Sequence, residues 1–132
     1  MPYKVYWIQS EQVIGAEAIG DMTEEEFFAM MHELQGCLNV VPSGTKAKIW
    51  VDSHQRKSLD ANIFHLDKVM RAILPILSSE KLCVVVAYDP FPNQLMSFLL
   101  EVVKAVSKAR VDRFESHAKA LACLNDDQCA VH

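Results

Sequence analysis

The feature that most constrains the fold is an apolar run, LCVVVAY, at residues 82–88. It contains three successive valines and no charged residue. A run of strand length that is rich in β-branched residues, and that does not alternate with polar ones, is typical of a parallel strand covered on both faces. We therefore expect a central strand here and an α/β domain around it.

Strand and helix patterns alternate through the rest of the chain. Alternating polar and apolar residues predict strands, and apolar residues at helical spacing predict helices. The strands are expected at residues 3–9, 12–19, 47–52, 82–88 and 110–114, and the helices at 24–38, about 60–77, 95–106 and 117–124. The order β-β-α-β-α-β-α-β-α, with right-handed crossovers, predicts a mostly parallel sheet packed by helices, with one antiparallel edge strand.

A capping box marks the start of the first helix. Thr23 and Glu26 have the spacing at which a hydroxyl and a carboxylate each accept a backbone N–H that the helix leaves unpaired. Glu24, Glu25 and Glu26 then form a first turn whose negative charge interacts favourably with the helix dipole. We interpret this acidic run as a helix start rather than a metal site, because it lacks His or Asp partners at ligand spacing.

Length and composition fit one globular domain. A chain of 132 residues can bury a single core, and we assign residues 1–124 to one domain and 125–132 to a C-terminal tail. With 51% hydrophobic and 23% charged residues, the chain is too apolar to be disordered and too interrupted by charge to be an integral membrane protein.

The cysteines and the N-terminus bear on location. The four cysteines, at positions 37, 83, 123 and 129, lack C-x-x-C spacing and are predicted to be buried free thiols. The N-terminus has the alternation of a strand and not the pattern of a signal peptide. Both observations predict a cytoplasmic protein.

Several classes of ligand are not predicted. The formal charge is −4 and the basic residues are scattered among acidic ones, which argues against nucleic acid as a partner. None of the four glycines belongs to a phosphate-binding loop, and no cofactor is predicted. His32, His65 and His117 lie on different predicted helices and form no H-x-x-x-H pair, so no metal site is predicted.

The candidate functional residues follow the third predicted strand. That strand is expected to end at Asp52, and residues 54–57 to form a polar loop before a helix capped by Ser58 or Asp60. Loops at the carboxyl ends of strands are where open α/β domains usually place their binding sites. The predicted binding residues are Asp52, Ser53, His54, Ser58, Asp60 and Asn62 in this region, and Phe91 in the segment after the 82–88 strand.

The same region contains a hydroxyl, an imidazole and carboxylates. A hydrolytic triad needs the hydroxyl and the imidazole within hydrogen-bond reach, and the chain has no G-x-S-x-G nucleophile elbow. Capping and turn roles account for these residue types equally well, so no catalytic residue is predicted.

The chain resembles the SpoIIAA-like fold of STAS domains (sulfate transporter and anti-sigma factor antagonist) and of related single-domain bacterial proteins of STAS/SEC14 type. The resemblance spans residues 3 to about 124. It rests on the element order and on three segments: Gly20-Asp21-Met22-Thr23 before the first helix, Ile49-Trp50-Val51-Asp52, and the ending Arg113-Phe114-Glu115-Ser116-His117-Ala118-Lys119-Ala120-Leu121. It implies the fold described above.

The family's regulatory serine has no counterpart in this sequence. Anti-sigma factor antagonists of the family carry a D-S-S-G-like segment after the third strand, and a partner kinase phosphorylates a serine in it. The matching stretch here is Asp60-Ala61-Asn62-Ile63, which keeps the acid and lacks both the serines and the glycine. The resemblance therefore implies a relative of these proteins without the phosphorylated position.

Three function hypotheses follow. The first is a non-enzymatic STAS-like regulatory module that binds a protein partner, or a second copy of itself as a homodimer, through residues 52–62 and the apolar helix 95–106. The second is a carrier of an apolar small molecule or lipid, of SEC14-like type, with a pocket lined by methionine and phenylalanine. The third is a small hydrolase that uses Ser53 and His54.

Overall fold

A five-stranded sheet forms the centre of the structure. The structure is a computed structural model, and it describes residues 3–58, 66–90, 101 and 103–126. The strands are β1 (Tyr3–Gln9), β2 (Val13–Asp21), β3 (Ala47–Ser58), β4 (Leu82–Tyr88) and β5 (Arg110–Phe114), and the helices are α1 (Glu24–Asn39), α2 (Leu66–Leu77) and α4 (His117–Leu124). Residues 101 and 103–106 are also helical, and the rest of the predicted 95–106 helix lies outside the described residues.

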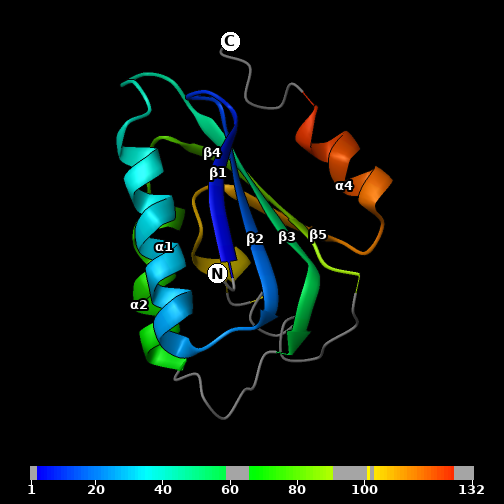
Figure 1. Cartoon of the computed structure of the whole chain (residues 1–132). Helices are drawn as coiled ribbons and strands as arrows, with labels where there is room; N and C mark the ends of the chain where they lie inside the picture. The colour runs from blue at the N-terminus through cyan, green and yellow to red at the C-terminus, as the bar shows by residue number, and fades with distance from the viewer. Residues whose placement is uncertain (1–2, 59–65, 91–100, 102, 127–132) are drawn as a thin grey trace.

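The strands lie in sequence order across the sheet, β1-β2-β3-β4-β5. β1 and β2 form an antiparallel hairpin, and each later strand is parallel to the one before it. Figure 1 shows α1 and α2 on one face of the sheet and α4 on the other. The predicted α/β architecture, a mostly parallel sheet with an antiparallel edge strand, is therefore confirmed.

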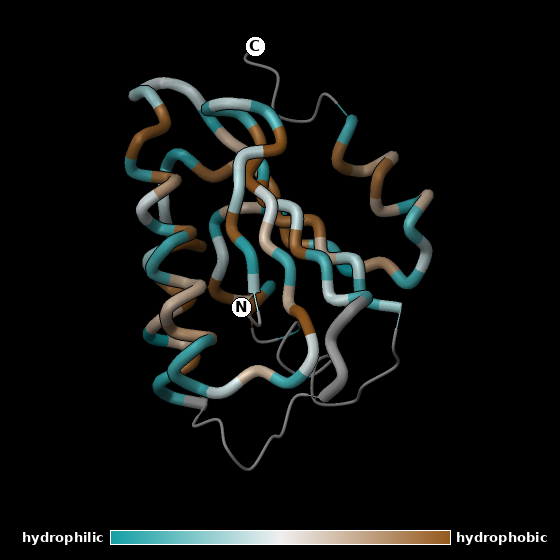
Figure 2. Tube along the Cα trace, viewed as in Figure 1, coloured by the Kyte–Doolittle hydropathy of each residue, from teal (hydrophilic) through white to brown (hydrophobic). Residues whose placement is uncertain are grey.

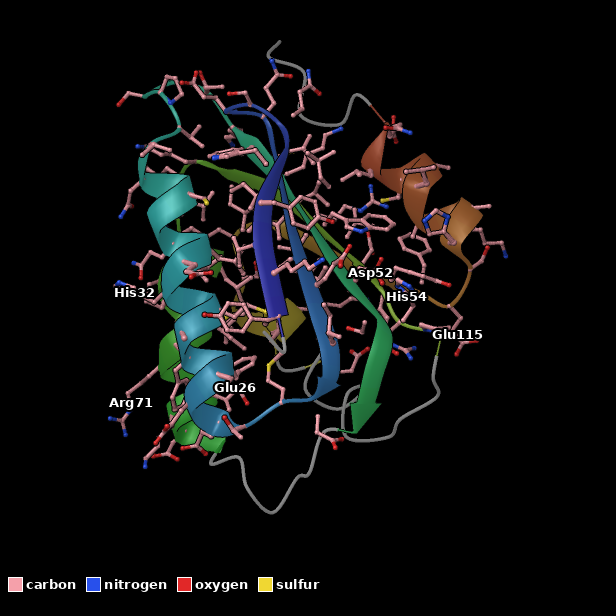
Figure 3. All side chains as sticks on the ribbon, in the orientation of Figure 1. Glu26, His32, Asp52, His54, Arg71 and Glu115 are labelled. Atoms are coloured by element: carbon pink, nitrogen blue, oxygen red, sulfur yellow. The ribbon has the colours of Figure 1, made fainter. Side chains whose placement is uncertain are left out.

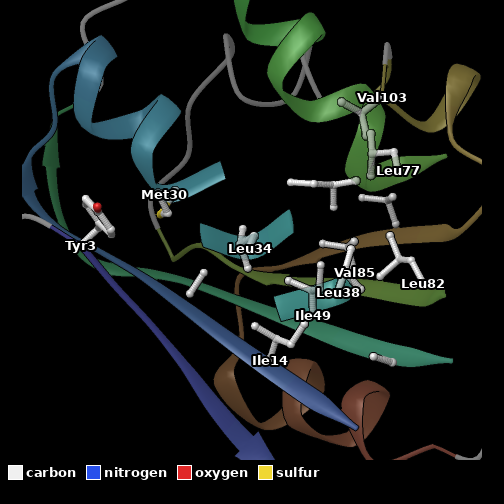
Figure 4. Packing of buried hydrophobic residues seen from close by; sticks show 14 of the residues in the cluster. Tyr3, Ile14, Met30, Leu34, Leu38, Ile49, Leu77, Leu82, Val85 and Val103 are labelled. Carbon is white, nitrogen blue, oxygen red and sulfur yellow. The ribbon is translucent and has the colours of Figure 1, made fainter. Parts of the chain in front are cut away.

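The main core lies between the sheet and helices α1 and α2. Because side chains alternate between the two faces of a strand, residues in register on neighbouring strands form rows on the same face. One such row is Trp7, Ile14, Ile49, Val85 and Val111. Figure 4 shows Leu34 and Leu38 of α1 and Leu77 of α2 packed over part of this row, and all three leucines are less than 5% exposed.

Helix α1 begins as the sequence predicts. Glu26 N donates to Thr23 Oγ1 at 3.2 Å, and Thr23 N donates to Glu26 Oε1 at 3.0 Å, so the capping box is confirmed. Hydrophilic and hydrophobic residues alternate along α1 and α2 in Figure 2, as expected for helices that bury one side against a sheet.

Strand β3 is longer than predicted. It continues through Ser58 because β2 offers partners beyond Asp52, with Ile19 opposite Gln55 and Asp21 opposite Ser58. The prediction of a polar loop over residues 54–57 is therefore wrong. Pairing with a long neighbour outweighs the low strand preference of polar residues, since that preference depends on context.

The cysteines differ from one another. Cys83 on β4 is disulfide-bonded, so the prediction that it is a free thiol is wrong. Cys37 and Cys123 carry thiols, and burial raises the pKa of the Cys37 thiol above its ordinary value. Cys129 lies outside the described residues.

Candidate functional site

A row of polar and aromatic residues crosses the whole sheet on the face against which α4 packs. Lys4, Glu17, Asp52, Tyr88 and Phe114 are register partners from β1 to β5. Neighbouring strands lie about 4.8 Å apart, so the backbones that carry the Glu17 and Asp52 carboxylates are adjacent. The sequence contains no motif that joins these residues, and only the register brings them together.

Asp52 and His54 form the closest pair at this row. Asp52 Oδ1 accepts a hydrogen bond from the His54 backbone N–H at 2.9 Å and lies 2.5 Å from His54 Nδ1. A bulge makes this possible, because residues 53 and 54 of β3 together stand opposite the single residue Ala18 of β2. The Asp52 residue is 7% exposed and the His54 side chain is 43% exposed, so a buried carboxylate holds an accessible imidazole.

Aromatic rings surround this pair. The rings of His54 and Tyr88 are stacked, with centroids 6.2 Å apart and an interplanar angle of 29°. Tyr88 also stacks on Trp50 at 6.2 Å and meets His117 of α4 edge-on at 5.1 Å. Figure 3 shows Asp52 and His54 on the side of the sheet toward α4. Residues from β3, β4 and α4 are thus joined by ring contacts.

Tyr6 of β1 lies across β2 from Asp52, and its side chain contacts the neighbouring strand β2. Tyr6 Oη donates a hydrogen bond to Glu17 Oε1 at 3.0 Å. Burial, together with that hydrogen bond and the negative charges of Glu17 and Asp52, raises the pKa of Tyr6 to about 12. The ring covers Gly15, where a Cβ atom would lie 2.6 Å from Tyr6 Cζ, so a side chain at this position would displace the ring.

We call Tyr6, Glu17, Asp52, His54, Tyr88 and His117 the acid–aromatic patch. Helix α4 packs on β4 and β5, so it bounds the patch on one side. Carboxylates accept charge-assisted hydrogen bonds, and the faces of aromatic rings attract cations. The arrangement therefore suits a positively charged group with N–H donors.

The structure brings two of the predicted site residues together and separates others from them. Asp52 and His54 come together, as described. Ser53 is 8% exposed and lies in the bulge, and within the described residues it makes no hydrogen bond to His54. Ser58 is the last residue of β3 rather than part of a loop. Asp60, Asn62 and Phe91 lie outside the described residues.

Four members of the patch were missed from the sequence: Tyr6, Glu17, Tyr88 and His117. Strand alternation gives the face on which Tyr6 and Glu17 lie, but their neighbours depend on the register between strands. The methionine and phenylalanine residues considered as a pocket lining belong largely to the core where they are described. Met22 and Met30 are buried in it, and Phe27, Met31 and Met70 pack against it.

A second charged group joins the carboxyl ends of β4 and β5. Arg113 Nη2 donates to the backbone oxygen of Asp89 at 3.3 Å and lies 3.7 Å from Asp89 Oδ2. Asp89 is 3% exposed, and its N–H donates to Phe114 O at 2.9 Å. These contacts fix the strand ends that carry Tyr88 and Phe114.

Two further observations concern metals and membranes. Among the described residues, no group of three or more His, Cys, Asp or Glu side chains is placed to hold a metal ion. In the same part of the chain, no helix combines the length and the apolar character needed to cross a membrane.

No family model and no curated protein sequence matches this chain. A solved structure does match it: an uncharacterized protein of the DUF3478 family from Shewanella loihica PV-4, described as having a SpoIIAA-like fold. The two chains are 15% identical, with a TM-score of 0.64 over 92% of this chain and 93% of that one. The chain therefore has the SpoIIAA-like fold that its sequence resembles.

Proposed function

We propose that this chain is a non-enzymatic binding module of STAS type, and that its acid–aromatic patch binds a basic segment of a protein partner. The observation that carries the proposal is the register of Glu17 with Asp52, which places two acidic residues on neighbouring strands, with aromatic residues next to each of them. The fold supports a module of this type, because a solved structure with a SpoIIAA-like fold matches 92% of this chain and the sequence resembles STAS domains.

The charge of the patch favours a basic partner. The chain has a formal charge of −4, which attracts cationic partners at long range. Asp52 is buried, so a bond that it makes is less screened by salt than a bond at the open surface. Arginine fits best, because its planar fork can meet a carboxylate while it stacks on an aromatic ring.

The contacts within the patch favour binding over hydrolysis. One oxygen of Asp52 already holds both the backbone and the ring of His54. Ser53, the nearest hydroxyl in sequence, lies within the bulge and does not bond to that ring in the described part of the chain. Asp52 thus orients His54, and its negative charge remains part of the patch.

The proposal is tested with a short peptide that contains two arginines, and with the same peptide in which citrulline replaces them. Addition of the arginine peptide is expected to shift the amide resonances of patch residues, and the neutral peptide is expected to leave them unchanged. Asp52→Asn keeps an acceptor for the His54 N–H and removes the charge. It should weaken binding roughly tenfold, as expected for a charge-assisted hydrogen bond.

Asp67→Asn is the matched control. Asp67 is an exposed residue of α2, on the opposite side of the sheet, where it pairs with Arg71 at 3.1 Å. It should leave peptide binding unchanged. In cell lysate, a partner retained by the wild type and by Asp67→Asn should be lost with Asp52→Asn. Equal binding of the arginine and citrulline peptides, or equal binding by the two variants, contradicts the proposal.

A further inference from the structure

A pocket of about 700 Å³ lies at the end of the sheet opposite to the acid–aromatic patch. It lies at the amino ends of β3 and β4, whereas Tyr88 and Phe114 of the polar row end β4 and β5. Its lining comes from the end of α1, the turn before β3, the segment between α2 and β4, and Lys108. The pocket is therefore independent of the acid–aromatic patch and of the function proposed for it.

A tight turn shapes one wall of the pocket. Thr45 N donates to Pro42 O at 3.1 Å, and Gly44 between them has a φ of 84°, as the third position of a type II turn requires. Ala47 N donates to Lys81 O at 2.7 Å, which joins this turn to the start of β4. The turn lies at the upper end of the molecule in Figure 1. The wall is thus held by backbone contacts.

Three lysines gather in this pocket: Lys46, Lys81 and Lys108. Glu80 is the acidic residue of the lining, so the pocket carries a net positive charge in a chain whose formal charge is −4. Lys81 Nζ donates to Asn39 O at 3.1 Å, which offsets the negative end of α1. Among the described residues, Lys46 and Lys108 have no hydrogen-bond or ion-pair partner.

We propose that this pocket binds a small phosphorylated molecule. Lysine ammonium groups bind phosphate as point charges, and the side chains of Ser43, Thr45 and Ser79 add hydroxyl donors to the same lining. A volume of about 700 Å³ exceeds a single phosphate ion and lies in the range of small-molecule sites. The three lysines of the lining, against a single acidic residue, favour an anion over a neutral apolar ligand.

The test is a titration of the full chain, followed by amide resonances, with inorganic phosphate, pyrophosphate and glycerol 3-phosphate at constant ionic strength. At least one of them is expected to cause saturable shifts at residues 43–46, 79–82 and 108. Lys46→Gln and Lys108→Gln should each raise the dissociation constant roughly tenfold, since each removes one charge-assisted contact. Both lysines are exposed, so neither change should disturb the fold.

Lys4→Gln and Lys119→Gln are the controls, because both lysines are exposed and lie away from the pocket. They should leave the dissociation constants unchanged. Shifts that do not saturate, shifts spread evenly over all lysines, or equal affinity in the pocket and control variants would overturn the proposal. The outcome is separate from that of the arginine-peptide experiment, since the two sites share no residue.

Discussion

Gly15→Ala probes how β1 and β2 hold the edge of the patch. The added Cβ would lie 2.6 Å from Tyr6 Cζ and 2.7 Å from Tyr6 Cε2, closer than carbon atoms that are not bonded to each other approach in proteins. Either the strands move apart or the tyrosine ring swings away, and in the second case the hydrogen bond to Glu17 is lost. Both responses weaken the same contact.

The magnitude follows from three contributions. Overpacking a closed site costs about 1–3 kcal/mol. Loss of the Tyr6–Glu17 hydrogen bond costs about 1 kcal/mol in this half-buried position. Replacing a glycine within a strand returns roughly 0.5–1 kcal/mol of backbone entropy. We expect a net loss of about 1–3 kcal/mol in the free energy of unfolding.

The assay is urea unfolding of Gly15→Ala, Tyr6→Val and the double variant. Without the tyrosine ring, the alanine has room, so Gly15→Ala should be neutral or slightly stabilising in the Tyr6→Val background. The coupling between the two positions should reach about 1 kcal/mol or more, as found for residues in contact. Equal costs of Gly15→Ala with and without the ring would refute this account.

Three further predictions concern single contacts. Folding raises the pKa of Tyr6 from its ordinary value of 10 to about 12, so the folded state holds the proton more tightly than the unfolded state. The free energy of unfolding should therefore fall as the pH rises from 10 through 12. In urea titrations at several pH values, Tyr6→Phe should show a smaller fall. Lys48→Met removes two 2.6 Å hydrogen bonds, from Nζ to Leu124 O and to Asp126 O, and should cost about 1–2 kcal/mol. Relative to the wild type, amide exchange should become faster in α4 and stay unchanged in α1. Arg113→Met removes the guanidinium that lies 3.7 Å from the buried Asp89 carboxylate and should lower the free energy of unfolding by roughly 3 kcal/mol in urea unfolding.

Matched changes check these results. Arg71→Met breaks an exposed pair with Asp67 and should cost less than about 1 kcal/mol, so a similar cost at Arg113 would argue against the role of burial. Lys119→Met, on the exposed side of α4, should leave amide exchange in that helix unchanged. A stability profile that is the same for wild type and Tyr6→Phe between pH 10 and 12 would exclude the tyrosine as the titrating group.

The elements themselves were readable from local patterns. β4 matches its prediction at both ends because seven apolar residues bounded by polar ones leave little choice of strand. α1 follows from its capping box and its apolar spacing. The end of β3 was not readable, because the residues after Asp52 are polar and only the length of β2 keeps them in the sheet.

The candidate site was readable only in part. Asp52 and His54 were found because they are two residues apart, and a bulge lets such neighbours touch. Glu17 and Tyr88 lie 35 or more residues away and reach Asp52 through strand register, which follows from packing of the whole sheet. The lysine pocket has the same origin, since its three lysines come from separate connections.

The two outer strands of the sheet influence how copies of this chain meet. β1 has a register shift between Trp7 and Gln9, and β5 is five residues long and carries Arg110 and Asp112. Short, charged or irregular edges discourage edge-to-edge pairing and fibril growth. At high concentration the chain should therefore resist amyloid-like aggregation, and a homodimer, which is still a prediction, should form through faces of the fold rather than by extending the sheet.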